Sequence, residues 1–273
     1  SLQGIYRRFW ELNVPLDVLC VEDILLSRPD QYQILFASNL IIMDDRLASA
    51  LLDYVQQGGT MICDGKFAEI DENGRLYPRI PGSKIQDILN YSVSDVAPAT
   101  GALLFTGDSP PLGELRSFFE MKEIDITSTQ VQVKAHFENG WPAVLRTVHG
   151  KGEIIQCATH IWLQACEVGS HTLERLVDWL CTRYNLKQME SDDPRLKTAC
   201  LREGSSSIVF LFNYSDDQIT TGLRFRVDQP GRCKVEFLNT TKEVEATVKE
   251  GFILFSVSVP PGETQFLRIH PVL

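Results

Sequence analysis

The chain has 273 residues, of which 44% are hydrophobic and 23% charged, a composition typical of a folded protein long enough for two domains. Its formal net charge is -10 and its pI is about 5.0, so its surface repels phosphate backbones, which argues against a nucleic-acid partner. No apolar run approaches the roughly 20 residues that cross a bilayer, so no membrane partner is expected, and Ser1–Trp10 lacks the apolar core of a signal peptide.

Cysteine usage favours a reducing compartment. The seven cysteines are odd in number and irregularly spaced, and no C-x-x-C pair indicates a zinc or redox motif. Several fall inside apolar patterns, where a free cysteine behaves as a small hydrophobe. We therefore expect a cytoplasmic location, with neither a metal nor another cofactor.

The first 64 residues predict alternating helices and strands. Apolar residues recur at helical spacing from Leu2 to Leu12, and Val14–Val21 is predicted as a strand. A short apolar run at Gln33–Ser38 is followed by a helix that Asp44 or Asp45 caps and Gly58-Gly59 ends. Thr60–Asp64 then predicts another strand, so the order indicates a right-handed parallel βαβ unit.

The middle of the chain is predicted to be rich in strands. A short helix is expected at Ser83–Asn90, and turn signals occur at Glu138–Gly140 and His149–Gly152. An amphipathic helix is expected at His171–Asn185. The strands predicted between the two helices are Ala102–Thr106, Ser117–Ile126, Gln130–Phe137, Ala143–Val148 and Glu153–His160.

The pattern changes after Met189–Arg195, a polar segment with a proline that is the best candidate for a linker. Beyond it lie seven short runs of strand-forming residues separated by turns, typical of a small antiparallel sandwich. We therefore predict one domain at residues 1–190 and a β-sandwich domain at residues 196–273.

Several motifs in the first domain resemble those of one known family. They are Asn13-Val14-Pro15 with Asp17, Tyr54-Val55 with Gly58-Gly59-Thr60, Gly150-Lys151-Gly152, and Thr159-His160. Their order and spacing resemble the middle domain of family 42 glycoside hydrolases, the β-galactosidase trimerisation domain. The resemblance implies a class I glutamine-amidotransferase-like, flavodoxin-like fold: a parallel sheet with helices on both faces, followed by the antiparallel β-sandwich.

The resemblance also implies a function in assembly rather than in catalysis. In that family the two catalytic glutamates lie on a (β/α)8 barrel, and no stretch of this chain supplies one. The chain is then either a fragment of a larger glycosidase or a relative without a barrel. We expect no catalytic residue in this chain, self-association as a homotrimer, a catalytic barrel in the parent chain, and carbohydrate as a further partner.

The alternative is a small amidotransferase-like hydrolase that uses Cys63 and His160. Active amidotransferases place the nucleophile in a G-x-C-x-G turn after a strand and a histidine after a later strand, as H-P-E. Here Met61 replaces the first glycine, and His160 is followed by Ile161 and Trp162. The plainer interpretation is a buried thiol and a histidine at a strand end.

Other candidate sites have equally plain explanations. Cys157 and His160 form C-x-x-H, but residues three apart on a strand point to opposite faces, which disfavours a shared metal. Trp162 follows a strand at the carboxyl edge of the predicted sheet and is the best candidate for a carbohydrate or interface contact. Further candidates are the tryptophans Trp10, Trp141 and Trp179, the alternating carboxylates Glu120, Glu123 and Asp125, and the calcium-loop-like Asp71–Gly74.

A third option places a carbohydrate-binding module on the sandwich. Its candidate residues, Tyr214, Phe225 and Phe237, include no tryptophan, so a stacking platform has little support from the sequence.

Overall fold

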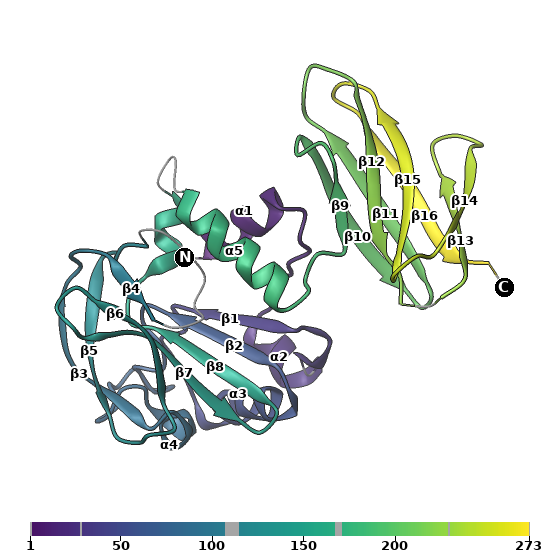
Figure 1. Cartoon of the computed structure of the whole chain (residues 1–273). Coiled ribbons are helices and arrows are strands. Elements are labelled where there is room, and N and C mark those ends of the chain that lie inside the picture. The colour runs from purple at the N-terminus through teal and green to yellow at the C-terminus, as the bar shows by residue number, and fades with distance from the viewer. Residues whose placement is uncertain (1, 28, 107–114, 167–170, 229, 273) are drawn as a thin grey trace. The chain divides into compact units, whose positions relative to one another are not determined.

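The computed structural model describes residues 2–27, 29–106, 115–166, 171–228 and 230–272. It divides into two compact units, the first made of residues 1–6 and 18–179 and the second of residues 7–17 and 180–273. The division therefore falls within the helices α1 (Leu2–Glu11) and α5 (His171–Arg183), both labelled in Figure 1. The limits 1–190 and 196–273 stay a prediction.

A six-stranded mixed sheet forms the centre of the first unit, in the order β1-β2-β8-β7-β6-β4. The pairs β1–β2 and β2–β8 are parallel, and the other three pairs are antiparallel. The strands are β1 (Ile34–Ser38), β2 (Thr60–Asp64), β4 (Leu103–Phe105), β6 (Gln132–Phe137), β7 (Pro142–His149) and β8 (Gly152–Cys157).

The predicted flavodoxin-like parallel sheet with helices on both faces is wrong. Three of the five strand pairs in the sheet are antiparallel, and strands outnumber helices along the described part of the chain. Two strands that are consecutive in the chain can pair in parallel only through a crossover of a dozen or more residues, usually a helix. Among the consecutive strands of this sheet, only β1 and β2 are joined in this way, by α3 (Asp45–Gln57). Short turns join β6 to β7 and β7 to β8, and Gly140 and Gly150 adopt positive φ in them, so the chain reverses.

The local prediction of strand, helix and strand is confirmed. Asp44 caps α3, and its Oδ1 accepts a hydrogen bond from the backbone N–H of Leu47 at 2.7 Å. Gly58 ends the helix with its N–H on the carbonyls of Tyr54 and Val55. The buried face of α3 carries Leu47, Ala48, Leu51, Tyr54 and Val55, as helical spacing requires.

Three other features differ from the predictions or add to them. Residues 14–20 form no strand, and the chain enters helix α2 (Val21–Ser27) instead. A two-stranded antiparallel sheet, β3 (Tyr91–Pro98) with β5 (Glu120–Ile126), lies beside the large sheet, and the N–H of Lys122 donates to the carbonyl of Ala158 at 2.9 Å. The predicted helix at 83–90 appears as a 3-10 turn followed by the short helix α4 (Gln86–Leu89).

The second unit contains all seven strands that the sequence predicted after residue 195. A five-stranded antiparallel sheet has the order β10-β11-β16-β13-β14, and a three-stranded one has the order β15-β12-β9. β9 falls inside the predicted linker. The strands are β9 (Met189–Ser191), β10 (Leu196–Glu203), β11 (Ser206–Asn213), β12 (Ile219–Arg226), β13 (Arg232–Phe237), β14 (Glu243–Thr247), β15 (Phe252–Val259) and β16 (Thr264–Pro271).

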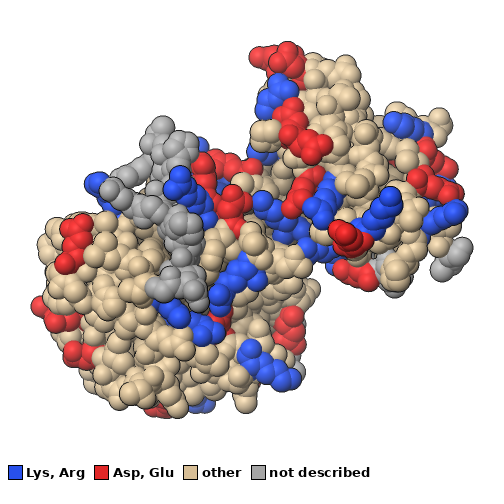
Figure 2. All heavy atoms as spheres, viewed as in Figure 1, with Lys and Arg blue, Asp and Glu red and all other residues tan. Residues whose placement is uncertain are grey.

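Alternating burial explains why these strands form a sandwich. Every second residue of β11 and of β15 is buried, and the residues between them face outward. The inward side chains of both sheets form one apolar cluster that includes Val209, Leu211 and Phe225. Figure 2 shows acidic and basic side chains interspersed over this unit, whereas the visible face of the first unit carries few of them.

No helix in the described ranges has the length and apolar character that a bilayer crossing requires.

The close contact between α3 and β8 generates a stability prediction. An added Cβ at Gly152 would lie 2.2 Å from the carbonyl oxygens of both Val55 and Gly59, so Gly152→Ala must displace backbone. We expect it to lower the free energy of unfolding by about 3 kcal/mol, measured by urea denaturation. The control is Gly74→Ala, where a Cβ meets nothing within 4 Å and only the positive φ costs about 1 kcal/mol. Equal losses in the two variants would contradict the proposed backbone contact.

Candidate functional site

The candidate site lies where the parallel strands β1, β2 and β8 reach their carboxyl ends. Cys63 is the penultimate residue of β2, pairs with Ala37 on one side and Gln156 on the other, and is fully buried. His160 follows β8 by three residues and is also buried. In the described ranges, no hydrogen bond joins the Cys63 thiol to the His160 ring.

The surroundings of Cys63 oppose its use as a nucleophile. Burial raises the pKa of its thiol well above the ordinary value, and the nearby Cys157 and Asp64 raise it further. Since the thiolate is the reactive form, such a thiol is inert near neutral pH. An added Cβ at Gly65 would lie 2.2 Å from Nδ1 of His160, so this glycine lets the backbone after β2 run directly against the imidazole.

His160 is bound to a carboxylate instead. Its Nε2 lies 3.3 Å from Oε1 of Glu120, and the ring of Phe119 meets the imidazole edge to face at 5.4 Å between centroids. Phe119 has a φ of 68°, a left-handed conformation that is unusual for an aromatic residue, and its side chain is exposed. The histidine is thus held by Phe119 and by Glu120, the first residue of β5.

Asp64 is the last residue of β2, and its carboxylate forms a hydrogen bond with the loop that follows β8. Ser38 Oγ donates to one carboxylate oxygen, and the backbone N–H of Trp162 donates to the other at 3.3 Å. Burial raises the pKa of this carboxyl, while the two hydrogen bonds and the nearby His160 lower it. Because Asp64 is completely buried and its oxygens are bonded, it serves to position the chain here.

The predicted carboxylates do not form a catalytic pair. Glu120 binds His160. Glu123 and Asp125 lie further along β5, opposite residues of β3, and Asp125 is exposed. In the part of the chain that the structure describes, no hydrogen bond or ion pair joins any two of the three. The ion pair in this region is instead Lys122 Nζ with Glu69 Oε1, at 2.6 Å and largely buried.

Neither metal motif of the sequence is assembled into a ligand cluster. Within the described residues, no group of three or more His, Cys, Asp and Glu side chains could hold a metal ion. Cys157 is buried, and burial raises the pKa of its thiol far above the ordinary value. Asp71 Oδ1 accepts the backbone N–H groups of Asn73 and Arg75 at 2.9 and 2.8 Å, so the calcium-like sequence is a hydrogen-bonded turn.

The tryptophans lie in different environments. Trp162 is buried, with its ring edge to face against Phe36 at 5.3 Å, and presents no surface to a carbohydrate. Trp141 and Trp179 are half-buried. Trp10 belongs to the second unit, where its ring lies 5.8 Å from that of Phe212.

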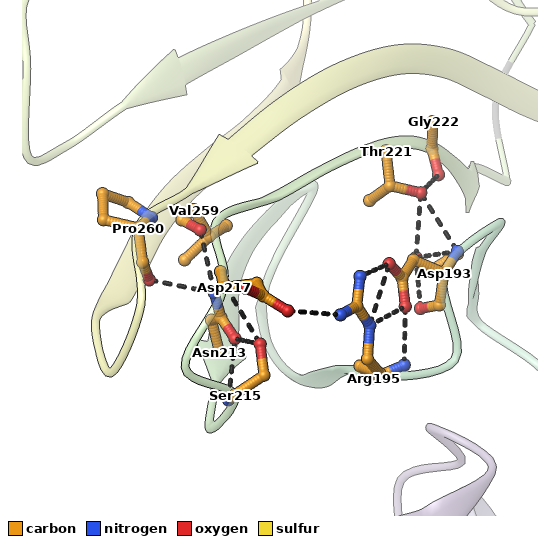
Figure 3. Close-up of polar contacts among 10 residues, drawn as sticks. Asp193, Arg195, Asn213, Ser215, Asp217, Thr221, Gly222, Val259 and Pro260 are labelled. Carbon is orange, nitrogen blue, oxygen red and sulfur yellow. Dashed lines mark hydrogen bonds and ion pairs between the residues drawn. The ribbon is translucent and has the colours of Figure 1, made fainter.

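Sequence analysis missed a polar cluster in the second unit (Figure 3). The Arg195 guanidinium binds the Asp193 carboxylate through Nε at 3.1 Å and Nη2 at 2.7 Å, and its Nη1 lies 3.5 Å from Asp217 Oδ2. These two carboxylates, and Asp193 above all, raise the pKa of Arg195, and Arg195 lowers that of Asp193. An open hollow of about 550 Å³ adjoins the cluster and is lined by Asp192, Asp193, Pro194, Arg195, Thr220, Thr221 and Gly222.

Asn213 ties the neighbouring loops together. Its amide nitrogen donates to the carbonyls of Asp217, Val259 and Pro260 at 2.8, 2.9 and 3.0 Å, and its Oδ1 accepts the N–H of Ser215 at 2.9 Å (Figure 3). The one available signal was the Asp-x-Arg spacing inside the segment that we predicted as a linker.

Curated relatives and solved structures are larger than this chain. The "Beta-galactosidase LacA" of Lactobacillus acidophilus is 21% identical over 230 residues, which cover 82% of this chain and 32% of that protein. The crystal structure of a β-galactosidase from Bacillus circulans sp. alkalophilus matches 98% of this chain and 37% of its own, with a TM-score of 0.74 and 16% identity. An α-L-fucosidase isoenzyme 2 from Paenibacillus thiaminolyticus matches 99% of this chain with a TM-score of 0.70 and 15% identity.

At such low identity the structural matches show a shared fold alone, and the chain spans about a third of the length of the curated relatives. The match to a family model is more specific than the structural matches. The model described as "Beta-galactosidase trimerisation domain" matches residues 1–187, more than half of the chain, and confirms the predicted resemblance. The chain therefore belongs to the β-galactosidase trimerisation domain family, a non-catalytic region of family 42 glycoside hydrolases.

Proposed function

We propose that this chain is the self-association region of a β-galactosidase-type glycoside hydrolase and that it forms a homotrimer. The observation that carries the proposal is the match of residues 1–187 to the trimerisation domain model. A catalytic (β/α)8 barrel would then lie elsewhere in the parent protein, and its substrate would be a carbohydrate. A cytoplasmic location is part of the proposal and accords with the free thiols of Cys20, Cys63, Cys157, Cys181, Cys200 and Cys233.

Exposed apolar side chains in the first unit support this proposal. Ile42 is 57% exposed and Leu76 68% exposed, and both pair through isolated bridges with Ile70 between them. A cyclic trimer joins two different surfaces of each copy, so an apolar patch on one surface suits it. We assign Ile42, Ile70 and Leu76 to the interface between copies.

The hydrolase alternative has no observation in its favour. A nucleophilic cysteine needs an accessible thiol of low pKa and a base within hydrogen-bond reach. Cys63 is buried with a raised pKa, and His160 is bound to Glu120.

Light scattering tests the proposed assembly. We expect a particle mass three times that of the 30.8 kDa chain, and we expect Ile42→Glu combined with Leu76→Glu to reduce it to a monomer. The charged side chains would be desolvated in the interface, so association should weaken by at least about a hundredfold.

The matched control for this double variant is Leu254→Glu. Leu254 is 66% exposed and lies in the second unit, beyond the residues that the family model matches, so its change should leave the mass of the particle intact. A wild-type chain that stays monomeric at high concentration would contradict the proposal.

Alkylation separates the assembly function from the hydrolase alternative. With iodoacetamide at pH 7.5 we expect Cys63 to remain unmodified in the folded protein and to react only after unfolding, because its burial excludes the reagent. Mass spectrometry of tryptic peptides reads out the reaction, and the exposed Cys20 is the internal control. Rapid alkylation of Cys63 that His160→Gln slows would revive the hydrolase alternative.

A further inference from the structure

The outer face of the five-stranded sheet carries an unusual run of aromatic residues. In β11 the inward residues are fully or nearly buried, while the outward positions hold Phe210 and Phe212, and Tyr214 follows directly after the strand. The outward rings are only half-buried, and Tyr214 is 71% exposed. The exposed face of an antiparallel sandwich sheet is usually polar, so these rings need a separate explanation.

The rings are arranged in a regular way. The planes of Phe210 and Phe212 are within 8° of parallel with centroids 6.3 Å apart, and those of Phe212 and Tyr214 are within 4° of parallel with centroids 5.9 Å apart. The ring of Trp10 lies 5.8 Å from that of Phe212, and the ring of Phe266 lies 5.4 Å from that of Phe210. We call these five residues, Trp10, Phe210, Phe212, Tyr214 and Phe266, the aromatic row.

The rest of the same face follows the usual polar pattern. Lys234 binds Glu236 at 3.3 Å and Glu243 at 2.9 Å, and Glu236 also contacts Arg268 and His270. One side of the face is therefore covered by ion pairs and the other by rings. Apolar surface that is gathered in this way marks a binding surface.

The polar cluster of Figure 3 includes Asn213, the last residue of the strand that carries Phe210 and Phe212. Leu196 of β10 is paired with Asn213 of β11, and Arg195 and Tyr214 are the next residues beyond this pair on the two strands. Arg195 is held in place by Asp193 and approaches Asp217, which is 80% exposed in its side chain. One end of the sheet thus carries the Tyr214 ring, the Arg195 guanidinium group and the Asp217 carboxylate, whose oxygens can still accept hydrogen bonds.

The charges near the row are already balanced. Arg195 is paired with Asp193. The other cation, Lys197, donates to the carbonyls of Glu11 and Pro194 at 2.9 Å each, and the exposed carboxylate of Asp217 matches its charge in number. An acidic or basic ligand would therefore meet little opposite charge. A neutral ligand with apolar C–H faces and many hydroxyl groups fits both the rings and the polar cluster.

We propose that the aromatic row and the Asp193–Arg195–Asp217 cluster form a binding surface for a neutral oligosaccharide. The exposed ring of Tyr214 packs on the C–H face of one sugar unit, and the outward edges of the stacked Phe212 and of Trp10 contact the next unit. Arg195, which lines the adjoining hollow, donates hydrogen bonds to sugar hydroxyls, and the exposed Asp217 carboxylate accepts them. This surface belongs to the second unit and does not rest on the proposed self-association.

Affinity electrophoresis of the whole chain tests the proposal, with soluble β-1,4-galactan in the gel as the neutral probe. We expect galactan to retard the wild-type chain and an anionic polymer, polygalacturonate, not to retard it. Tyr214→Ala and Arg195→Gln should each weaken galactan binding about tenfold, because each removes one ring contact or one charged donor. Both residues are largely exposed, so the urea unfolding midpoint should be unchanged.

The control variant is Tyr6→Ala, which removes an exposed tyrosine from the first unit and should bind galactan normally. The Ile42→Glu, Leu76→Glu variant should also bind normally, which separates this proposal from the assembly proposal. No retardation by galactan, or retardation that Tyr214→Ala and Arg195→Gln leave intact, would overturn the proposal. So would a loss of particle mass in Tyr214→Ala without any galactan binding, since the row would then be a contact between copies.

Discussion

The first unit depends on the double pairing of β8. This strand is the parallel neighbour of β2 on one side and the antiparallel neighbour of β7 on the other, so it joins the two halves of the sheet. Its first residue, Gly152, admits the backbone of α3 at a distance that no side chain allows. Just after β8, the carbonyl of Ala158 accepts a hydrogen bond from the N–H of Lys122 in β5, and the N–H of Trp162 donates one to Asp64. Once β8 is in place, the position of every other element of this sheet is constrained.

Local patterns predicted elements well and topology poorly. The capping Asp44, the stop at Gly58 and the apolar face of α3 are encoded within a few residues, and the structure has them where expected. The seven strands of the second unit were found because their burial alternates with a period of two. The direction of strand pairing was predicted wrongly. The resemblance implied a parallel sheet, whereas the turns at 138–140 and 149–152 connect antiparallel strands. Val14–Val21 has strand-forming residues, but no neighbour pairs with it, and tertiary context overrides propensity there.

The candidate site shows a similar division. The order of motifs along the chain placed Cys63 and His160 at the same edge of the sheet, and they lie there. The raised pKa of the Cys63 thiol depends on burial, and the partner of His160 is Glu120 of another strand, so spacing alone could not predict either. The aromatic row was missed for the same reason. Trp10 and Tyr214 are some 200 residues apart in sequence, and only the fold of the second unit places both beside Phe212.

The amide of Asn213 has a consequence for how the second unit meets a ligand. By bonding to carbonyls of two separate loops, it joins the segment after β11 to the end of β15, so neither segment can shift without breaking buried hydrogen bonds. Tyr214, the residue after Asn213, therefore has a rigid backbone although its ring is exposed to solvent. The backbone that carries Tyr214 therefore loses little conformational entropy when a ligand covers the ring. Most of the entropy cost of binding then comes from ordering the ligand.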